Sequence, residues 1–401
     1  MISVSEARQL IQANTSLLEP ISTPLYEANG RVMAEDLEST TDVPPFDQSA
    51  MDGYAFNYAD FNANTSLAIM GEIAAGVFPQ HKLLPQTAFR IYTGAQVPKG
   101  CDTIVMQEKV RVKEGHIYIE DSQLKVGANI RLKGSQTKKG ELVLKAGTRI
   151  SPGIAGFMAG LGVSQVMTFR VPRVGIINTG KELSSPGLAL LPGKIYESNS
   201  YSLNAALREL HIKPAFMVCV DDDEAQTTKL IQEHLSHCDV MLLSGGVSVG
   251  DHDYVEQSLK NCGVEKIFHK VKQKPGKPLY FGRKGKRLFF GLPGNPAAVL
   301  TCYYEYVMPS LLQLMGIPVN TRSKILLPLR KAYSKKPGLT HFLKGKIHGH
   351  EVEVLPAQES YLMNSFAAAD CIIQLEEEKN EFERGSLVEV HPLFQPLLIQ
   401  K

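Results

Sequence analysis

The chain has 401 residues, 43% of them hydrophobic and 21% charged, which is typical of a soluble globular protein with two to four domains. Its 43 basic and 41 acidic residues leave a net charge of +2, so charge gives no argument for nucleic acid or a membrane surface as a partner. The N-terminus lacks the apolar core of a signal peptide and the 6 cysteines form no C-x-x-C pair, so we expect a cytoplasmic protein with reduced thiols.

Strand and turn signals dominate residues 40–150 and predict a β-rich region. The expected strands are 68–72, 89–93, 103–112 and 116–120, the last two joined as a hairpin. The polar segment DVPPFDQSAMDGYAF at 42–56 has apolar flanks, which indicate that packing holds it in place. Three polar residues of this region stand out: Asp52 in that segment, Thr93 at a strand end, and Arg131.

Residues 151–169 carry no charge, which raises the question of a membrane span. Glycines recur through this stretch, and the apolar run is too weak for a spanning helix. Small residues at such spacing are typical of a helix packed closely against another element, and that is the structure we expect.

Strand and helix patterns alternate over residues 171–316. The expected strands are 173–177, 215–220, 240–243, 264–271 and 288–290, and the expected helices are 201–210, 224–236, 254–262 and 297–315. This alternation predicts an open parallel α/β sheet with helices on both faces. Ligands of such sheets bind beyond the carboxyl ends of the strands, where the motifs of this region all lie.

The most informative of these motifs is DVMLLSGGVSVGDHDY at 239–254, an apolar strand that runs into Gly245-Gly246 and then Ser248. A glycine turn lets backbone N–H groups approach an anion, and a following helix adds its positive end. Carboxylates such as Asp253 beside a phosphate make sense with a divalent metal or with a water to be activated. The alternative is a tight strand-to-helix turn with a capping aspartate.

Other strand ends carry further polar side chains. TGKEL places Glu182 after a turn, and Asp221 opens a run of three aspartates in which Asp222 and Asp223 are expected in a solvated turn or helix cap. In FHKVKQKPGKP, alternation along a strand predicts that Lys270, Lys272 and Lys274 lie on one face and bind an anion together. The alternative is that these lysines are solvent-exposed and bind no ligand. Lys277 follows the Pro-Gly turn. Pro293-Gly294-Asn295 turns a strand into a helix, in which Pro296 suits the first position. The N–H groups of this turn are free to bind a phosphate.

Short alternating segments return at 319–401 and predict a small, barrel-like β-domain. Its expected strands are 324–329, 342–347, 351–355, 371–375 and 387–390.

Five motifs of this chain occur in the order found in the molybdopterin molybdenumtransferases: PPFDQSAMDGYAF, RIYTGAQVP, SGGVSVGDHDY, KPGKP and LPGNP. The chain resembles this family, which comprises the bacterial MoeA proteins and the gephyrin E-domain relatives, over its whole length. The resemblance implies a cytoplasmic homodimer with four domains in each protomer. These are an α/β molybdopterin-binding domain (1–20 and 171–318), a linking and dimerisation domain (21–39 and 141–170), a β-rich domain (40–140) and a C-terminal domain (319–401). It also implies Mg²⁺-dependent insertion of molybdate into adenylylated molybdopterin with release of AMP.

The resemblance also assigns residues to the reaction. The implied catalytic set is Asp52, Thr93, Glu182, Asp221, Asp253, Lys270, Lys274 and Ser360, with Asp221 and Asp253 as metal ligands. The expected cofactor-binding set is Arg131, Gly245, Gly246, Ser248, Lys277, Pro293, Gly294 and Asn295. Asp52 would reach the site from the neighbouring protomer.

Three alternatives stay open. A molybdopterin adenylyltransferase uses a similar α/β domain but lacks the flanking regions. A scaffold or carrier would bind molybdopterin without turnover, and a tungsten-preferring insertase would take a nearly isosteric oxyanion. The adenylyltransferase and acceptor molybdoenzymes are the expected protein partners.

Overall fold

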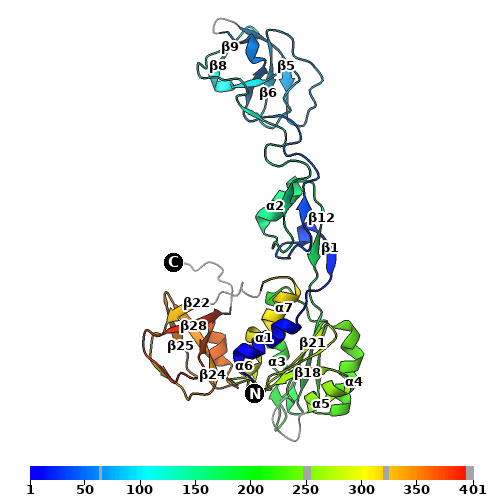
Figure 1. Ribbon diagram of the computed structural model, residues 1–401, viewed down its shortest axis with the longest axis vertical. Coiled ribbons are helices and arrows are strands. Elements are labelled where there is room, and N and C mark those ends of the chain that lie inside the picture. The colour runs from blue at the N-terminus through cyan, green and yellow to red at the C-terminus, as the bar shows by residue number, and fades with distance from the viewer. Residues whose placement is uncertain (63–65, 247–253, 319–324, 394–401) are drawn as a thin grey trace. The chain divides into compact units, whose positions relative to one another are not determined.

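The computed structural model describes residues 1–62, 66–246, 254–318 and 325–393. Its contacts divide the chain into two compact units, one formed by Met1–Ile21 with Phe169–Lys401 and the other by Ser22–Thr168 (Figure 1). The first unit is therefore discontinuous in sequence, because the second is inserted after its first helix. The finer division into four domains stays a prediction.

A six-stranded mixed sheet forms the centre of the first unit. In spatial order its strands are β16 (Phe216–Val220), β13 (Val174–Thr179), β17 (Val240–Ser244), β21 (Arg287–Leu292), β20 (Tyr280–Lys284) and β18 (Glu265–His269). The first four pair in parallel, whereas β20 runs against both of its neighbours. The open α/β sheet is confirmed, with one antiparallel strand, β20, that the sequence did not predict.

The central strands β13, β17 and β21 are buried on both faces, which explains why they are hydrophobic without alternation. Ile176 and Leu242 lie in one core cluster, and Ile177 and Leu243, one position further along each strand, lie in another. The helices that contribute buried residues to the first cluster are α1 (Val4–Asn14), α3 (Asn199–Glu209), α6 (Pro296–Cys302), α7 (Met308–Leu314) and α8 (Asn364–Ala368). Those of the second are α4 (Glu224–His234) and α5 (Tyr254–Asn261). A π-helical segment, Tyr303–Val307, joins α6 to α7, so the long helix expected at 297–315 is confirmed.

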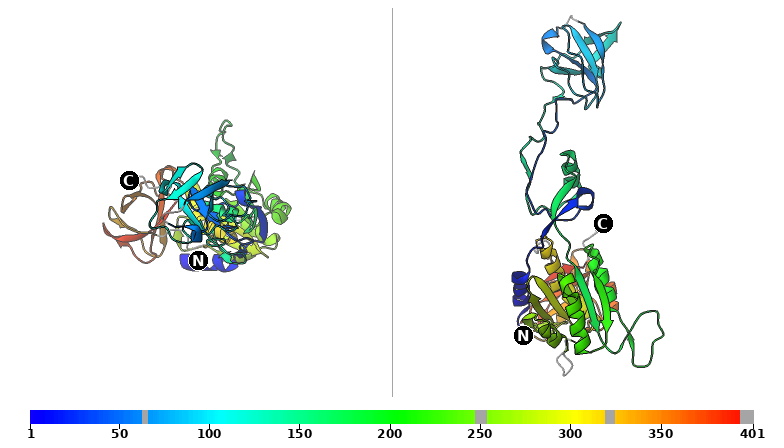
Figure 2. Two further views of the ribbon diagram at one scale, coloured as in Figure 1. Left: turned by 90° about the horizontal axis from the view of Figure 1, so that it is seen from above. Right: turned by 90° about the vertical axis from the view of Figure 1, so that its right-hand side faces the viewer.

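A segment on the carboxyl side of β13 extends away from the central sheet (Figure 2, right). It lies between β14 (Leu183–Ser184) and β15 (Ile195–Tyr196), which pair in parallel. The amide of Ile195 donates to the Glu182 carbonyl at 2.8 Å, so the base of this segment is held at the predicted TGKEL turn.

The C-terminal part of the first unit is a second six-stranded sheet. Its path runs through β19 (Gln273–Lys274), β24 (Thr340–His348), β26 (Cys371–Leu375), β28 (Leu387–Pro392) and β22 (Ile325–Pro328), and β25 (Glu351–Val354) pairs with β24. Leu343, Ile373 and Val390 form part of its core. The small β-domain is thus present, and β19 joins it to the chain of the α/β part. Outside the sheet lie α8 (Asn364–Ala368) and the pair β23 (Tyr333–Ser334) and β27 (Glu381–Phe382).

A third six-stranded sheet forms the core of the second unit. Its order is β7 (Thr103–Met106), β4 (Gly53–Phe56), β6 (Thr87–Ile91), β5 (Leu67–Ile73), β9 (His116–Ile119) and β8 (Val110–Lys113). The hairpin of β8 and β9 is confirmed, but the strand expected at 103–112 is two strands separated by a 3-10 turn, η3 (Gln107–Lys109).

Short paired strands complete this unit. They are β1 (Pro20–Pro24) with β12 (Gln165–Phe169), β2 (Leu37–Glu38) with β11 (Leu142–Leu144), and β3 (Gln48–Ser49) with β10 (Ile130–Arg131). The uncharged stretch forms a nine-residue helix, α2 (Pro152–Gly160), followed by β12. Among the described residues, no helix combines the length and the apolar character needed to span a bilayer.

Candidate functional site

Gly245 and Gly246 follow β17 directly and pack against the end of β13. Both have left-handed backbones, with φ of +86° and +61°. A Cβ on Gly245 would lie 2.2 Å from the Thr179 carbonyl oxygen, so only glycine fits there. The predicted glycine turn is therefore present and packs against the neighbouring strand, while its approach to an anion stays a prediction. Ser248 and Asp253 lie outside the described residues.

The Pro293-Gly294-Asn295 turn follows β21, and Pro296 occupies the first position of α6, as expected. Asn295 Nδ2 donates to Ser360 Oγ at 2.7 Å, which brings the predicted serine to this turn from the C-terminal part of the chain. The Ser360 carbonyl accepts from the Ala297 and Ala298 amides at 3.0 and 3.3 Å. A backbone carbonyl therefore already caps the first amides of α6. The expectation that the N–H groups of the turn before Pro296 bind a phosphate stays a prediction.

Asn199 and Glu197 are polar residues of this edge that sequence analysis missed. Asn199 Nδ2 donates at 2.9 Å to both Ser244 Oγ and the Gly294 carbonyl, bridging the ends of β17 and β21. Glu197 is buried and accepts from Asn178 Nδ2 at 2.6 Å and from the Ser200 amide at 2.8 Å. The signal was the polar run ESNS at 197–200, just before a predicted helix.

Three buried oxygen atoms at this edge lack a hydrogen-bond partner among the described residues: Asn178 Oδ1, Thr179 Oγ1 and Asn199 Oδ1. Buried polar atoms are normally paired, so an unpaired group indicates a place for a ligand or a water molecule. Two of the three are acceptors only, and they suit a group that donates hydrogen bonds.

Carboxylates gather at the ends of β13 and β16. Burial and then the charges of Glu197, Asp221, Glu182 and Asp222 raise the pKa of the Cys219 thiol, so all four carboxylates lie close enough to this end of β16 for their charges to act on it. Asp223 Oδ1 caps α4 by accepting from the Gln226 amide at 2.7 Å, as expected. Asp222 accepts from the Lys181 amide at 3.4 Å, which leaves Glu182 and Asp221 as the candidate ligands.

These carboxylates do not make a closed metal site by themselves. Within the described part of the chain, no three His, Cys, Asp or Glu side chains converge on one point. Mg²⁺ commonly uses one or two carboxylates with substrate phosphates and water for the rest, so a carboxylate pair fits its chemistry. The ligand pair of Asp221 and Asp253 stays a prediction.

The lysines do not form the predicted stripe. Lys270 has a left-handed φ of +75° just after the end of β18, and Lys274 belongs to β19 in a different sheet, so alternation along one strand does not apply. Lys272 Nζ binds Glu377 at 2.9 Å, which raises the lysine pKa. Lys274 and Lys277 are exposed. Burial and then the charges of Lys335 and Lys274 lower the pKa of His341 to about 4.

Asp52 and Thr93 meet in the second unit. Asp52 directly precedes β4, and its Oδ1 accepts from the Thr93 amide at 2.8 Å and from the Thr93 hydroxyl at 2.7 Å. The bond from the Thr93 amide lowers the pKa of Asp52 most, followed by the bond from the Thr93 hydroxyl, and the charge of Arg90 lowers it further. The group is therefore a carboxylate at neutral pH. No donor among the described residues bonds to Oδ2, which leaves that oxygen for a ligand. Arg131 is exposed in β10, opposite Gln48 of β3.

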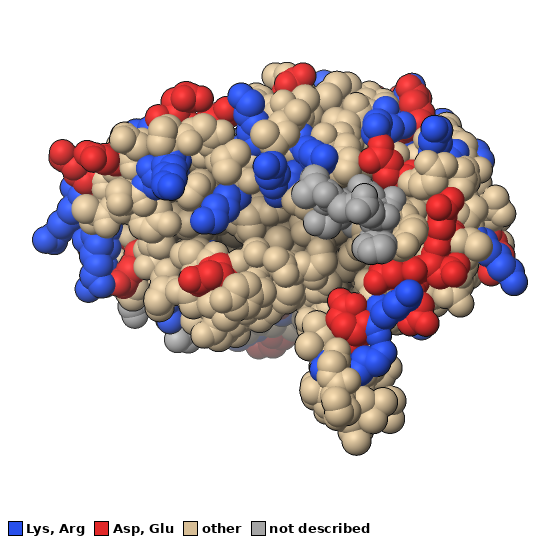
Figure 3. Space-filling model, turned by 90° about the horizontal axis from the view of Figure 1, so that it is seen from below, with Lys and Arg blue, Asp and Glu red and all other residues tan. Residues whose placement is uncertain are grey.

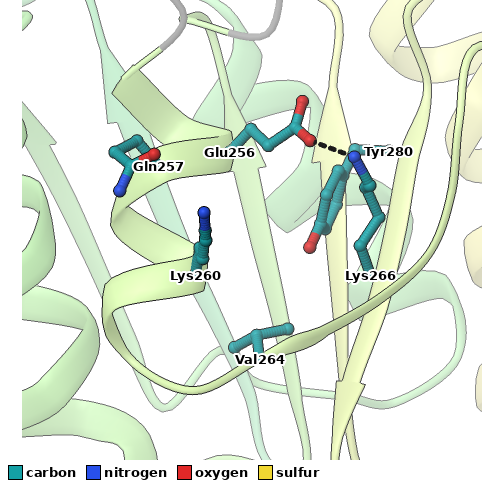
Figure 4. Close-up of a pocket in the computed structure, with 6 residues that line it drawn as sticks. All are labelled: Glu256, Gln257, Lys260, Val264, Lys266 and Tyr280. Carbon is teal, nitrogen blue, oxygen red and sulfur yellow. Dashed lines mark hydrogen bonds and ion pairs between the residues drawn. The ribbon is translucent and has the colours of Figure 1, made fainter.

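A pocket of about 490 Å³ lies against α5, apart from the predicted residues. Glu256, Gln257, Lys260, Val264, Lys266 and Tyr280 line it, and Lys266 binds Glu256 within it (Figure 4). Its lining has no glycine turn and no unpaired carboxylate, so we place the site at the strand ends instead. On one face of the molecule, Lys and Arg side chains gather in the upper half and Asp and Glu side chains around the projecting segment at lower right (Figure 3).

This architecture defines a multidomain protein whose central sheet is of the molybdopterin-binding type. Residues 175–313 match the probable molybdopterin binding domain, and the flanking residues 2–162 and 327–393 match the MoeA N-terminal region (domain I and II) and the MoeA C-terminal region (domain IV). The chain belongs to the MoeA family of molybdopterin molybdenumtransferases.

Relatives support this membership over almost the whole chain. The molybdopterin molybdenumtransferase of Haemophilus influenzae is 34% identical over 396 residues, which cover 96% of this chain and 98% of that protein. That of Nostoc sp. is 39% identical over 301 residues, 73% of this chain and 69% of the relative. The crystal structure of the molybdopterin biosynthesis MoeA protein from Pyrococcus horikosii superposes with a TM-score of 0.86 at 30% identity, covering 98% of this chain and 100% of that one.

Proposed function

We propose that this protein is a transferase of molybdenum cofactor biosynthesis that inserts molybdate into adenylylated molybdopterin and releases AMP, with Mg²⁺. The names of its relatives support the insertion of molybdenum. The observation that carries the proposal is the meeting at one sheet edge of the Gly245-Gly246 turn, the Asn199 bridge and the carboxylates Glu182 and Asp221.

The chemistry of this edge suits the two halves of the reaction. Insertion exchanges one molybdate oxygen for the dithiolene, and the two thiol protons leave with that oxygen as water. In the cleavage, water adds across the pyrophosphate and one bridging P–O bond breaks. AMP is released as one of the two phosphate products. Mg²⁺, when bound, would neutralise the pyrophosphate charge. Glu182 and Asp221 would hold it or orient the attacking water, and the exposed Lys274 and Lys277 would attract the oxyanions.

We also propose that the protein acts as a homodimer in the cytoplasm, with Asp52 completing the site of its partner subunit. The unbonded Oδ2 of Asp52 supports a role outside its own sheet. Co-expressed Asp52→Asn and Asp221→Asn chains, each inactive alone, would then regain about a quarter of the activity, because half of the dimers carry one intact site out of two. A site built within one protomer would give no recovery.

The experiment that tests the function is AMP release from adenylylated molybdopterin by the purified protein with Mg²⁺, with and without molybdate. Release that depends on molybdate supports the insertase, and binding without release would indicate a scaffold or carrier instead. Replacing molybdate by tungstate decides the metal preference. The adenylyltransferase that makes this substrate and the molybdoenzymes that accept the product are the protein partners that the reaction requires.

A further inference from the structure

Arg90 contacts the neighbours of Asp52 on two sides. It lies in β6 opposite Tyr54 of β4, and one guanidinium nitrogen donates to the Gly53 carbonyl at 2.9 Å. Another nitrogen donates to the side-chain oxygen Oε1 of Gln107. The backbone N–H of Gln107 in turn donates to the backbone carbonyl of Asp52 at 3.0 Å. The Arg90 side chain therefore links β4 and η3, which are the two segments that hold the Asp52 backbone.

Two aromatic rings hold this guanidinium in place. Its central carbon lies 5.2 Å from the Tyr54 ring centroid and 4.9 Å from that of Tyr92, both within cation–π range. Tyr92 immediately precedes Thr93, the residue that binds the Asp52 carboxylate. Arg90 thus contacts the strand end that carries Asp52 and the strand end that carries Thr93.

The charge of Arg90 also reaches the carboxylates around it. It contributes to the lowered pKa of Asp52 after the two Thr93 bonds. It also contributes to the lowered pKa of Glu108, after hydrogen bonds to the Glu108 backbone and the Gln107 side chain. The two described hydrogen bonds of the Arg90 guanidinium go to neutral acceptors, the Gly53 carbonyl and Gln107 Oε1, and neither neutralises its charge. The planar fork of an arginine suits this arrangement, because it serves two acceptors and stacks on rings at once.

We propose that Arg90 is a positioning residue for the reaction, which ties the ends of β4, β6 and η3 together so that the Asp52–Thr93 pair presents its free carboxylate oxygen to the ligand in one orientation. This proposal rests on the function proposed above, in which Asp52 acts on the ligand. It adds a role for Arg90, which opens the RIYTGAQVP motif but was assigned no function there, since only Thr93 of that motif was a candidate site residue.

Three variants of the full chain test this role. Arg90→Met removes the charge and the hydrogen bonds, and Arg90→Lys keeps the charge but not the fork. Arg111→Met is the matched control. Arg111 also lies in this sheet, and its guanidinium carbon is 4.9 Å from the ring centroid of Tyr118. Its ion pair, however, is with the exposed Glu120, away from Asp52. We expect molybdate-dependent AMP release to fall about tenfold or more in Arg90→Met, less in Arg90→Lys, and not at all in the control.

A second readout separates positioning from mere support of the fold. The carboxyl ¹³C resonance of Asp52, assigned by its absence in Asp52→Asn, gives the pKa of this group directly. We expect the pKa to rise toward the ordinary aspartate value in Arg90→Met and to move less in Arg90→Lys. If Arg90→Met melts early, Arg90→Lys decides the question by the same two readouts.

Wild-type rates together with an unchanged Asp52 pKa in Arg90→Met would overturn the proposal. So would equal losses in the Arg90 variants and in Arg111→Met, because the effect would then be a general one of the sheet. If the wild type itself released no AMP, the proposed function would fail, while the titration would still show whether Arg90 and Asp52 are coupled.

Discussion

At the scale of single residues, the Asp52–Thr93 pair joins residues from two separate sequence motifs. The aspartate lies before one strand and the threonine after another, and two hydrogen bonds to a single oxygen join them. Thr93 is therefore a hydrogen-bond donor to a carboxylate through both its amide and its hydroxyl. The carboxylate keeps one oxygen for a partner from outside.

We predict that Asp52→Asn lowers molybdate-dependent AMP release by about 10²-fold or more without changing the thermal unfolding of the protein, because the charge is lost while the shape is kept. Exposed Glu38→Gln in β2 of the same unit is the control and should behave as wild type. Since the folded-state pKa of Asp52 is lowered, its charge is present at neutral pH and disappears only as the pH falls through that lowered value. Full activity of Asp52→Asn would remove this residue from the site.

At the scale of elements, close backbone approaches decide which strands can pair. Gly53 opens β4, and a Cβ there would lie 1.9 Å from the Val105 carbonyl oxygen of β7. The glycine that follows Asp52 in the motif is thus required by the sheet, while the aspartate beside it is the residue that we propose for the site. Likewise Gly245 is needed because β17 ends against Thr179.

We predict that Gly53→Ala destabilises the protein by about 1–3 kcal/mol, since the backbone of β7 must shift to admit the methyl group. Gly71→Ala in β5 of the same sheet is the control, because a Cβ there meets nothing within 4 Å. The midpoint of urea unfolding, followed by circular dichroism, measures both changes. An equal midpoint for the two variants would contradict the argument from close approach.

The elements also show where patterns in the sequence were insufficient. The hydrophobic runs of β13 and β17 predicted buried strands because burial on both faces demands such runs. The strand expected at 264–271 ends at His269, because Lys270 has a left-handed backbone, and β20 went unpredicted. Neither the turn at Lys270 nor the pairing of β20 has a local signal, since both depend on the neighbours in the sheet.

At the scale of the whole molecule, the first helix belongs to the unit that resumes after residue 168. Val4, Ala7 and Ile11 of α1 are buried in the core cluster of the central sheet. Arg8 binds Glu305 at 2.5 Å, and that glutamate is fully buried. By contrast, the core clusters of residues 22–168 are formed by this segment alone.

We predict that a fragment of residues 22–168 folds on its own with a cooperative thermal transition, whereas residues 169–401 alone are strongly destabilised. Without α1 that fragment exposes the core surface that Val4, Ala7 and Ile11 cover, and Glu305 loses Arg8 while it keeps its contact with His391 at 3.0 Å. Residues 1–21 joined to 169–401 by a short Gly/Ser linker should restore the transition, because the Arg170 amide already donates to the Glu19 carbonyl at 3.4 Å. Equal stability of the two versions would show that α1 is dispensable.

The sequence by itself determined the open α/β sheet, the Gly245-Gly246 turn, the cap at Asp223 and the strand-end carboxylates, because each follows from periodicity or from the conformational needs of a few adjacent residues. Only the tertiary structure decided that Ser360 caps α6, that Asp52 binds Thr93 and that Arg90 joins their strands. These contacts link residues as far as 65 positions apart, and such partners are chosen by the packing of whole elements. The lysine stripe failed for the same reason, since the direction of a side chain depends on the strand to which its residue finally belongs.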